Sequence, residues 1–235
     1  MVLNLYSGDP DESCGISTSG GTESIILACL AYREQARARG VTAPNIVVPQ
    51  TAHAAFDKAG FYLNIEIRKV SPTKEGLRCD LAGMQRAVDR NTICVAGSAP
   101  DYAHGNYDPI PQLGQLALRW KIGCHVDCCL GSFINPFAAP AGFPLQFPVD
   151  FAVPGVTSIS CDPHKYAYGP KGFSVCMFST KSLRASQFFA CMDWQGGFYA
   201  TTTIVCQKHD SCLLCPCAAV PPSCPAAGCQ LTRLW

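Results

Sequence analysis

Short apolar runs and longer amphipathic stretches alternate along residues 1–203 of the chain. The apolar runs are rich in β-branched residues, which is typical of buried strands, whereas the amphipathic stretches repeat with helical periodicity. The pattern predicts strands at 45–49, 63–70, 92–96, 122–126, 155–160 and 173–178. It predicts helices at 22–39, 53–60, 80–90 and 113–120, and only turns in residues 1–21.

This alternation of strands with helices of about ten residues predicts an α/β fold, in which helices cover both faces of a mostly parallel sheet. In such sheets, ligands bind beyond the carboxyl ends of the strands. Ser98 and Asp127 follow or end two predicted strands, and Lys165 lies just past a third. We therefore expect these three polar residues at one rim of the sheet.

Composition narrows the class of protein. With 48% hydrophobic and 15% charged residues, the 235-residue chain is expected to be globular rather than disordered. Its net charge of +1 leaves no basic surplus for binding nucleic acid or an anionic membrane. We find neither an apolar run long enough to span a bilayer nor a secretory signal, so we expect a soluble domain.

The 16 cysteines fall into two groups. Those before residue 200 lie mostly inside apolar runs, where free thiols behave as small hydrophobic side chains, and a chain of this length fits a reducing compartment. The remaining cysteines crowd into residues 204–235, together with several prolines. This tail lacks helical or strand periodicity, so we expect it to be disordered. Its Cys and His spacing does not match a paired zinc motif, and we expect no metal site.

Four motifs can carry chemistry, and each has a plain structural alternative. Gly20 and Gly21 open a helix, where free amides bind phosphate or simply form an N-terminus. Asp127 can cap a loop or pair with a pyridinium nitrogen. Lys165 can be a solvated surface residue or, if burial lowers its pKa, a Schiff-base amine. His53 can cap a helix or stack on an aromatic cofactor. Together, these four groups are what pyridoxal phosphate requires.

Five stretches of the sequence make a resemblance specific. They are TSGGTES (18–24), AHAAFDKA (52–59), HVDCCLGSF (125–133), GVTSISCDPHKYAYGPKG (155–172) and DWQGGFYA (193–200). Through these stretches the chain resembles the sphingosine-1-phosphate lyase family, which is related to the group II amino-acid decarboxylases, over about residues 1–203. The resemblance implies the large domain of the pyridoxal phosphate (PLP)-dependent transferases (aspartate aminotransferase fold, fold type I), with the C-terminal small domain missing and residues 204–235 unrelated to the family.

The resemblance also assigns roles to individual residues. It implies that Lys165 forms the Schiff base with PLP, that Asp127 pairs with the pyridinium nitrogen and that His53 stacks on the ring. Further roles follow for the phosphate contacts Gly21, Thr22 and His164, for Tyr102 in proton transfer, and for Lys171 in assisting the substrate or its phosphate.

The implied reaction is retro-aldol cleavage of sphingosine 1-phosphate, a phosphorylated sphingoid base, to a long-chain aldehyde and phosphoethanolamine. The family forms homodimers and acts at the endoplasmic reticulum membrane, with its catalytic domain facing the cytosol. Because we find no anchor in this chain, we expect it to be cytoplasmic or associated with the endoplasmic reticulum.

Two alternatives remain open at this point. One is a catalytically inactive product of the same ancestry, because the chain is expected to be truncated and departs from the family at Cys128, Pro163 and residues 166–169. The other is a truncated PLP-dependent amino-acid decarboxylase. The stretch DWQGG argues against the second alternative.

Overall fold

The structure is a computed structural model that describes residues 1–204. Nearly all of the predicted tail, including its cysteines and its Cys and His spacing, lies outside the described residues. The expectation that this tail is disordered therefore stays a prediction.

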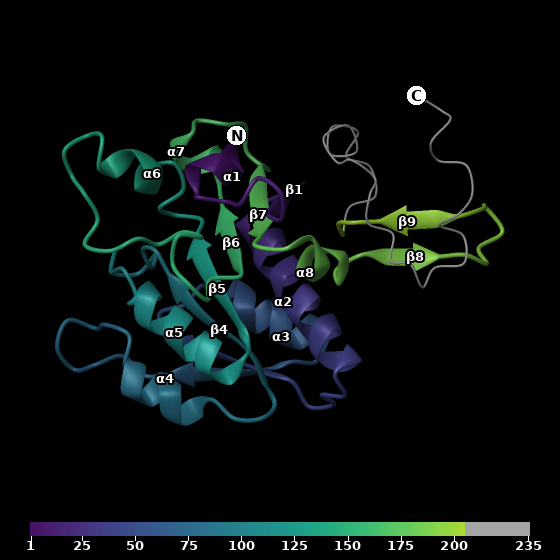
Figure 1. Ribbon diagram of the computed structural model, residues 1–235, viewed down its shortest axis with the longest axis horizontal. Coiled ribbons are helices and arrows are strands. Elements are labelled where there is room, and N and C mark those ends of the chain that lie inside the picture. Colours follow the sequence, from purple (N-terminus) through teal and green to yellow (C-terminus); the bar gives the residue numbers. More distant parts are fainter. Residues whose placement is uncertain (205–235) are drawn as a thin grey trace.

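Seven strands form one twisted sheet at the centre of the molecule (Figure 1). Their order is β1-β7-β6-β5-β4-β2-β3. Neighbouring strands from β3 to β6 run parallel, whereas β7 is antiparallel to both β6 and β1. This topology confirms the predicted α/β fold with a mostly parallel sheet. The strands are β1 (Cys14–Thr18), β2 (Asn45–Pro49), β3 (Glu66–Val70), β4 (Thr92–Ser98), β5 (Gly123–Cys128), β6 (Ser158–Cys161) and β7 (Ser174–Phe178).

Helices cover both faces of the sheet, as predicted (Figure 1). Helices α2 (Gly21–Ala38), α3 (Ala55–Leu63) and α8 (Lys181–Ala185) bury side chains in one hydrophobic cluster. Helices α1 (Val2–Leu5), α4 (Leu81–Ala87) and α5 (Ile110–Trp120) pack into a second cluster on the opposite face. Because successive strand residues point to opposite faces, β5 sends Val126 and Cys128 into the second cluster and its polar residues toward α2 and α3.

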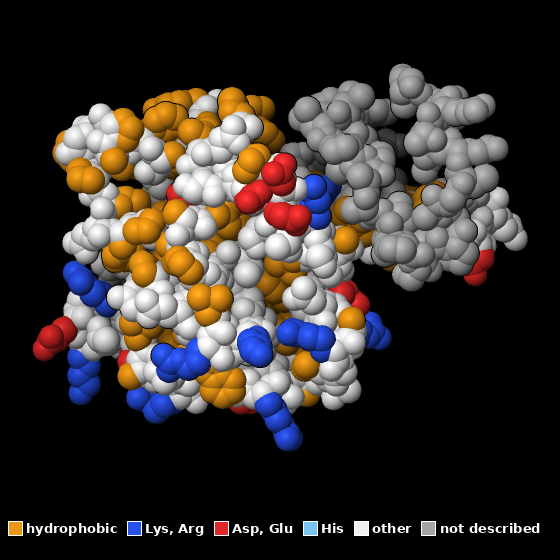
Figure 2. Space-filling view, viewed as in Figure 1, with side chains coloured by type: hydrophobic (Ala, Val, Ile, Leu, Met, Phe, Trp, Pro, Cys, Tyr) orange, Lys and Arg blue, Asp and Glu red, His pale blue; other side chains and the backbone are white. Residues whose placement is uncertain are grey.

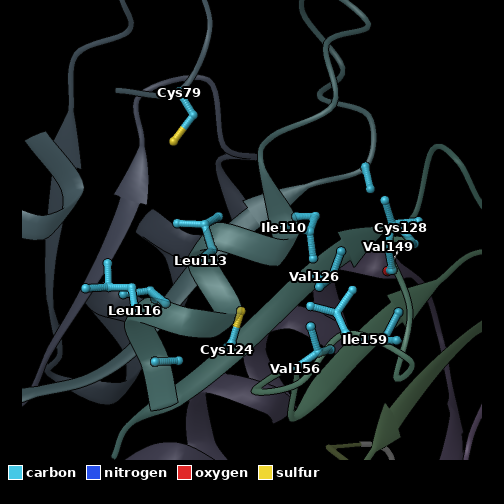
Figure 3. Close-up of a cluster of buried hydrophobic side chains, with 14 of the residues drawn as sticks. Cys79, Ile110, Leu113, Leu116, Cys124, Val126, Cys128, Val149, Val156 and Ile159 are labelled. Atoms are coloured by element: carbon cyan, nitrogen blue, oxygen red, sulfur yellow. Dashed lines mark hydrogen bonds between the residues drawn. The ribbon is translucent and has the colours of Figure 1, made fainter. Parts of the chain in front are cut away.

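The cluster beneath α5 is a closely packed core (Figure 3). Ile110, Leu113 and Leu116 of α5 belong to this cluster together with Val126 of β5 and Ile159 of β6, and Ile110 lies next to Val126 (Figure 3). All five side chains are buried. Removing one of them leaves a cavity that the surrounding elements cannot fully close.

Leu113→Ala is therefore expected to lower the free energy of unfolding by about 2–5 kcal/mol. Leu118→Ala is the matched control, because Leu118 lies on the same helix with 55% of its surface exposed, whereas Leu113 is fully buried. The control is expected to stay within about 0.5 kcal/mol of the parent chain. Urea unfolding of the two variants measures the difference, and equal losses would contradict the assigned orientation of α5.

The N-terminal segment corrects one prediction. Residues 1–21 contain α1 and β1 rather than turns alone. Strand β1 is short and only alternate residues are buried, so its local pattern is weak. It forms because its backbone pairs with β7, more than 150 residues later in the chain. Pairing at such a sequence separation leaves no local signal.

Several element boundaries also differ from the predictions. The helix expected at 53–60 runs from Ala55 to Leu63, and Asn64 ends it in the left-handed conformation, so β3 begins only at Glu66. The structure adds elements that the pattern did not predict. They are α6 (Ile134–Ala138), α7 (Pro163–Tyr166), α8, and a separate hairpin of β8 (Phe189–Cys191) and β9 (Tyr199–Thr201).

Apolar side chains reach the surface around α6. Figure 2 shows hydrophobic side chains gathered over the upper part of the molecule, where Figure 1 places α6. Ile134, Phe137 and Phe143 of α6 and the following segment are exposed. No helix within residues 1–204 is both long enough and apolar enough to cross a membrane.

Candidate functional site

A cavity of about 540 Å³ lies at the carboxyl ends of β5 and β6, beside the first turn of α2. It is on the face of the sheet that carries α2 and α3, and residues from five separate stretches of the chain line it. Six of the predicted site residues come together here: Gly21, Thr22, His53, Asp127, His164 and Lys165.

Lys165 is held by an acidic partner that the sequence analysis did not single out. Its Nζ lies 3.0 Å from Asp162 Oδ2, and His164 Nε2 lies 3.6 Å from the same oxygen. Burial by itself lowers the pKa of Lys165, but the neighbouring Asp162 carboxylate outweighs burial, so the pKa is raised above its ordinary value. The net shift in the pKa of Lys165 is therefore opposite to the lowered pKa that the Schiff-base alternative required. Lys165 rests as an ammonium ion and must lose a proton before it can act as a nucleophile.

Local structure explains how Asp162 reaches this place. It follows β6 directly, and Pro163 then begins α7, which turns the chain sharply at the rim of the sheet. Ser132 Oγ donates a hydrogen bond of 2.6 Å to the backbone oxygen of Asp162. The Asp162 side chain is almost fully buried, and its Oδ1 has no hydrogen-bond partner within residues 1–204. An unpaired buried carboxylate oxygen is costly, which marks this point of the cavity as one where a donor is missing.

The start of α2 lies against Asp162. A Cβ atom on Gly21 would lie 2.6 Å from Cys129 Sγ and 2.8 Å from Asp162 Oδ2, so only glycine fits there. Behind it, Glu23 Oε2 accepts hydrogen bonds from both the backbone N–H and the hydroxyl of Ser19, which fixes the turn into the helix. The first amides of a helix have no partner inside the helix, and they attract anions. This turn is therefore a helix cap whose first amides line the cavity.

Asp127 occupies the floor of the cavity. Its side chain is almost fully buried, and its Oδ1 accepts hydrogen bonds from the backbone N–H of Cys129 at 3.0 Å and from Ser160 Oγ at 3.3 Å. A carboxylate held this way is fixed in orientation rather than free to rotate. It can pair with a cationic group placed above it.

His53 lies on the opposite side of the cavity, before α3. Its Nδ1 accepts a hydrogen bond of 3.0 Å from the backbone N–H of Ala55, so it does cap the helix, as the structural alternative expected. It nevertheless also lines the cavity. Its ring is therefore held in place by the cap while one side stays open to a ligand.

Three other predicted residues lie outside this cavity. Tyr102 is 81% exposed and lines a second cavity of about 550 Å³, which adjoins the first at His53. Lys171 is exposed and lines neither cavity. Ser98 is buried beside Asp127 in the sheet, with its backbone N–H bonded to Asp108, and it does not line the cavity.

The structure also adds lining residues that sequence reasoning missed. Asp162 stood inside the quoted lysine motif, three residues before Lys165, a spacing that could have identified it. Cys129 was quoted only as part of a motif, because a buried cysteine has no distinctive pattern. The others became visible only once the chain was folded: Glu23, Ile25, Ile26, Lys58, Tyr62 and Ile204.

Asp162→Asn is expected to make Lys165 more reactive. The neutral amide no longer favours the ammonium form, so the pKa of Lys165 falls and the free amine is more abundant at mildly alkaline pH. Reductive methylation at pH 8, followed by peptide mapping, should modify Lys165 several-fold faster in the variant. Lys181, an exposed lysine on α8, serves as the internal reference. A rate for Lys165 that is unchanged relative to Lys181 would contradict the control by Asp162.

Known proteins are similar to this chain over most of its length. Residues 3–194 match the family model described as the pyridoxal-dependent decarboxylase conserved domain. The chain is 52% identical over 204 residues to sphingosine-1-phosphate lyase 1 of Rattus norvegicus, and 45% identical over 205 residues to the sphingosine-1-phosphate lyase of Saccharomyces cerevisiae. Both alignments cover 87% of this chain but only 36% and 35% of the relatives. The chain therefore spans about a third of the length of these curated relatives.

Solved structures show the same likeness. A sphingosine-1-phosphate lyase of Burkholderia pseudomallei matches with a TM-score of 0.85 and 39% identity, covering 88% of this chain and 49% of that chain. A glutamate decarboxylase of Lactobacillus brevis matches with a TM-score of 0.74 and 26% identity over the same shares of the two chains.

Proposed function

The chain belongs to the pyridoxal-dependent decarboxylase family, and on this premise we propose that it binds pyridoxal phosphate in the cavity at the ends of β5 and β6. One observation carries the proposal. A lysine, a fixed carboxylate, an imidazole and a glycine-lined helix start, which come from distant parts of the sequence, line a single cavity. These four groups meet the needs of an aldehyde, a ring nitrogen, an aromatic face and a phosphate, in that order.

The residues present fit this cofactor. Because Gly21 has no side chain, the start of α2 packs directly against Cys129 and Asp162 at the cavity wall, and Thr22 and His164 line the same cavity, where they can contact a phosphate. The His53 ring, held by its cap, presents a flat face.

When bound, the cofactor supplies an electron-accepting ring. The chain's own residues prepare the site for it. Lys165 would hold the cofactor through Nζ, and Asp162, which accepts a hydrogen bond from that amine, orients it beforehand. Asp127 holds a negative charge at the floor of the cavity and favours a protonated ring nitrogen. The first turns of α2 and the segment before α3 form walls of the cavity.

We further propose a carbon–carbon lyase that cleaves phosphorylated sphingoid bases such as sphingosine 1-phosphate. The curated relatives named above are lyases of this kind, and the solved lyase matches with higher identity and a higher TM-score than the solved decarboxylase does. Retro-aldol cleavage of such a substrate requires a base at its C3 hydroxyl. Tyr102 lines the adjoining cavity, and it remains our candidate for proton transfer, with Lys171 for the substrate phosphate. A homodimer acting at the endoplasmic reticulum is part of the same proposal.

The test combines the purified chain with PLP and either sphingosine 1-phosphate or glutamate. Release of a long-chain aldehyde from the first substrate, with no carbon dioxide from the second, is the expected result. Release of carbon dioxide from glutamate would indicate that the chain is a decarboxylase rather than a lyase. Cofactor binding without either product would instead favour a catalytically inactive member of the family.

A further inference from the structure

A series of buried, hydrogen-bonded polar side chains lies beneath Asp127, between the sheet and helices α2 and α3. The parallel register of β5 and β6 places His125 opposite Ser158 and Asp127 opposite Ser160. The His125 ring is almost fully buried and packs edge-on against Phe56 of α3, with the ring centroids 5.9 Å apart. Its environment therefore allows a single orientation.

Both ring nitrogens of His125 have a partner. Nδ1 lies 2.7 Å from Ser158 Oγ, and Nε2 lies 3.2 Å from Ser160 Oγ. Burial lowers the pKa of His125 to about 4, so the ring is neutral at neutral pH and carries one N–H. One nitrogen must therefore donate while the other accepts.

The hydrogens of the two serines decide which nitrogen donates. Ser160 has a single hydroxyl hydrogen, and the acceptors within reach are Asp127 Oδ1 at 3.3 Å, His125 Nε2 and the weakly accepting Cys129 thiol. A carboxylate is the strongest acceptor, so the hydrogen goes to Asp127. Ser160 Oγ can then only accept from His125, which puts the ring hydrogen on Nε2.

The hydrogen bonds on the Nδ1 side of His125 are consistent with this direction. With Nε2 protonated, Nδ1 accepts from Ser158 Oγ, which uses the only hydroxyl hydrogen of Ser158. Tyr32 OH lies 2.5 Å from Ser158 Oγ, 2.7 Å from Thr157 Oγ1 and 3.5 Å from the Cys124 carbonyl oxygen. Because the Ser158 hydrogen is already used, the contact between Tyr32 and Ser158 requires Tyr32 to donate. The hydrogen bonds then all run in one direction, from Tyr32 to Ser158, His125 and Ser160 in turn. The last of them is donated by Ser160 to Asp127 Oδ1.

We propose that His125 is a positioning residue, and that its neutral Nε2–H form keeps the Ser160 hydroxyl hydrogen on Asp127 Oδ1. The reversed direction would turn that hydrogen toward His125 and leave Asp127 Oδ1 with the Cys129 amide alone. His125 therefore orients Asp127 through Ser160 without touching the cavity itself. The consequence for cofactor binding rests on the proposed function, whereas the direction of the hydrogen bonds does not.

Nitrogen-15 NMR of the histidine-labelled full chain tests the direction. A His125→Gln spectrum identifies the signal among the five histidines. The expected result is a proton on Nε2 and none on Nδ1 at pH 7, without any cofactor added. A proton on Nδ1, or on both nitrogens, would overturn the proposal. This measurement needs no folded variant at Ser160, and it decides the proposal even if the chain binds no PLP.

Ser160→Ala then tests the consequence. Loss of one hydrogen bond to a carboxylate is expected to weaken PLP binding roughly tenfold and to move the nitrogen-15 signal of labelled PLP toward that of a neutral ring nitrogen. Ser174→Ala is the matched control, because Ser174 is an equally buried serine on the neighbouring strand β7, bonded to Ser24. Equal losses in the two variants, or an unmoved ring signal in Ser160→Ala, would contradict the positioning role. Failure of the parent chain to bind PLP would instead contradict the proposed function.

Discussion

Lys165→Ala is expected to abolish covalent attachment of PLP while leaving weaker, noncovalent binding. Lys165 is the lysine that Asp162 holds just after β6, and its Nζ is the amine that we propose bonds to the cofactor. The amides at the start of α2 remain in the variant, and so does the anion site that they form. Absorbance of the chain mixed with PLP, before and after borohydride reduction, measures attachment. No lysine should carry the reduced cofactor in the variant.

Two further variants separate chemistry from folding. Lys181→Ala removes an exposed lysine on α8 and should leave attachment unchanged. Lys165→Arg keeps a positive charge beside Asp162 but provides no amine that can form the bond. Attachment that persists in Lys165→Ala at the level of the parent chain would move the reacting amine to another lysine. Lys58, which also lines the cavity, would be the first to examine.

Asp127→Asn is expected to lower turnover by about 100- to 1,000-fold. A pair of opposite charges at hydrogen-bonding distance contributes several kcal/mol at an effective dielectric constant of about 20, and each 1.36 kcal/mol corresponds to a factor of ten in rate. The amide keeps the shape of the carboxylate and can still accept from Cys129 and Ser160, so the site should stay folded. Turnover with sphingosine 1-phosphate, measured alongside the thermal unfolding of the variant, tests the charge itself.

Asp108→Asn is the control for that loss. Asp108 is also a buried carboxyl group near the sheet rim, where it accepts from the backbone N–H of Ser98. Burial raises its pKa to about 7, so a large share of molecules already carry it neutral at pH 7. Its amide variant should therefore stay close to the parent rate. Similar losses from the two variants would mean that Asp127 acts through packing rather than through charge.

The sequence predicts the sheet well where each element carries its own pattern. Strand β2 is fully buried along its length, so its continuous β-branched run could be recognised without the structure. Helix α2 combines a glycine start with a long amphipathic repeat, and its predicted bounds lie within one residue of the observed ones. Strand β1 could not be predicted, because it depends on pairing with β7.

The candidate site, too, could be predicted from the sequence only in part. Residues at strand ends gather because parallel strands end at one rim, which is why Asp127 and Lys165 were expected together. Sequence spacing gave no sign that Asp162 would leave Oδ1 unpaired or raise the pKa of Lys165. It also gave no sign that His125 would bond to both Ser158 and Ser160, because that contact depends on the register of β5 against β6.

Reduction of the PLP-treated chain with borohydride, followed by peptide mapping, tests the central proposal most directly. The predicted result is a yellow complex before reduction and, after it, the reduced cofactor attached to the peptide that contains Lys165. Absence of any specific attachment, or attachment spread over exposed lysines such as Lys171 and Lys181, would contradict a cofactor site in this cavity.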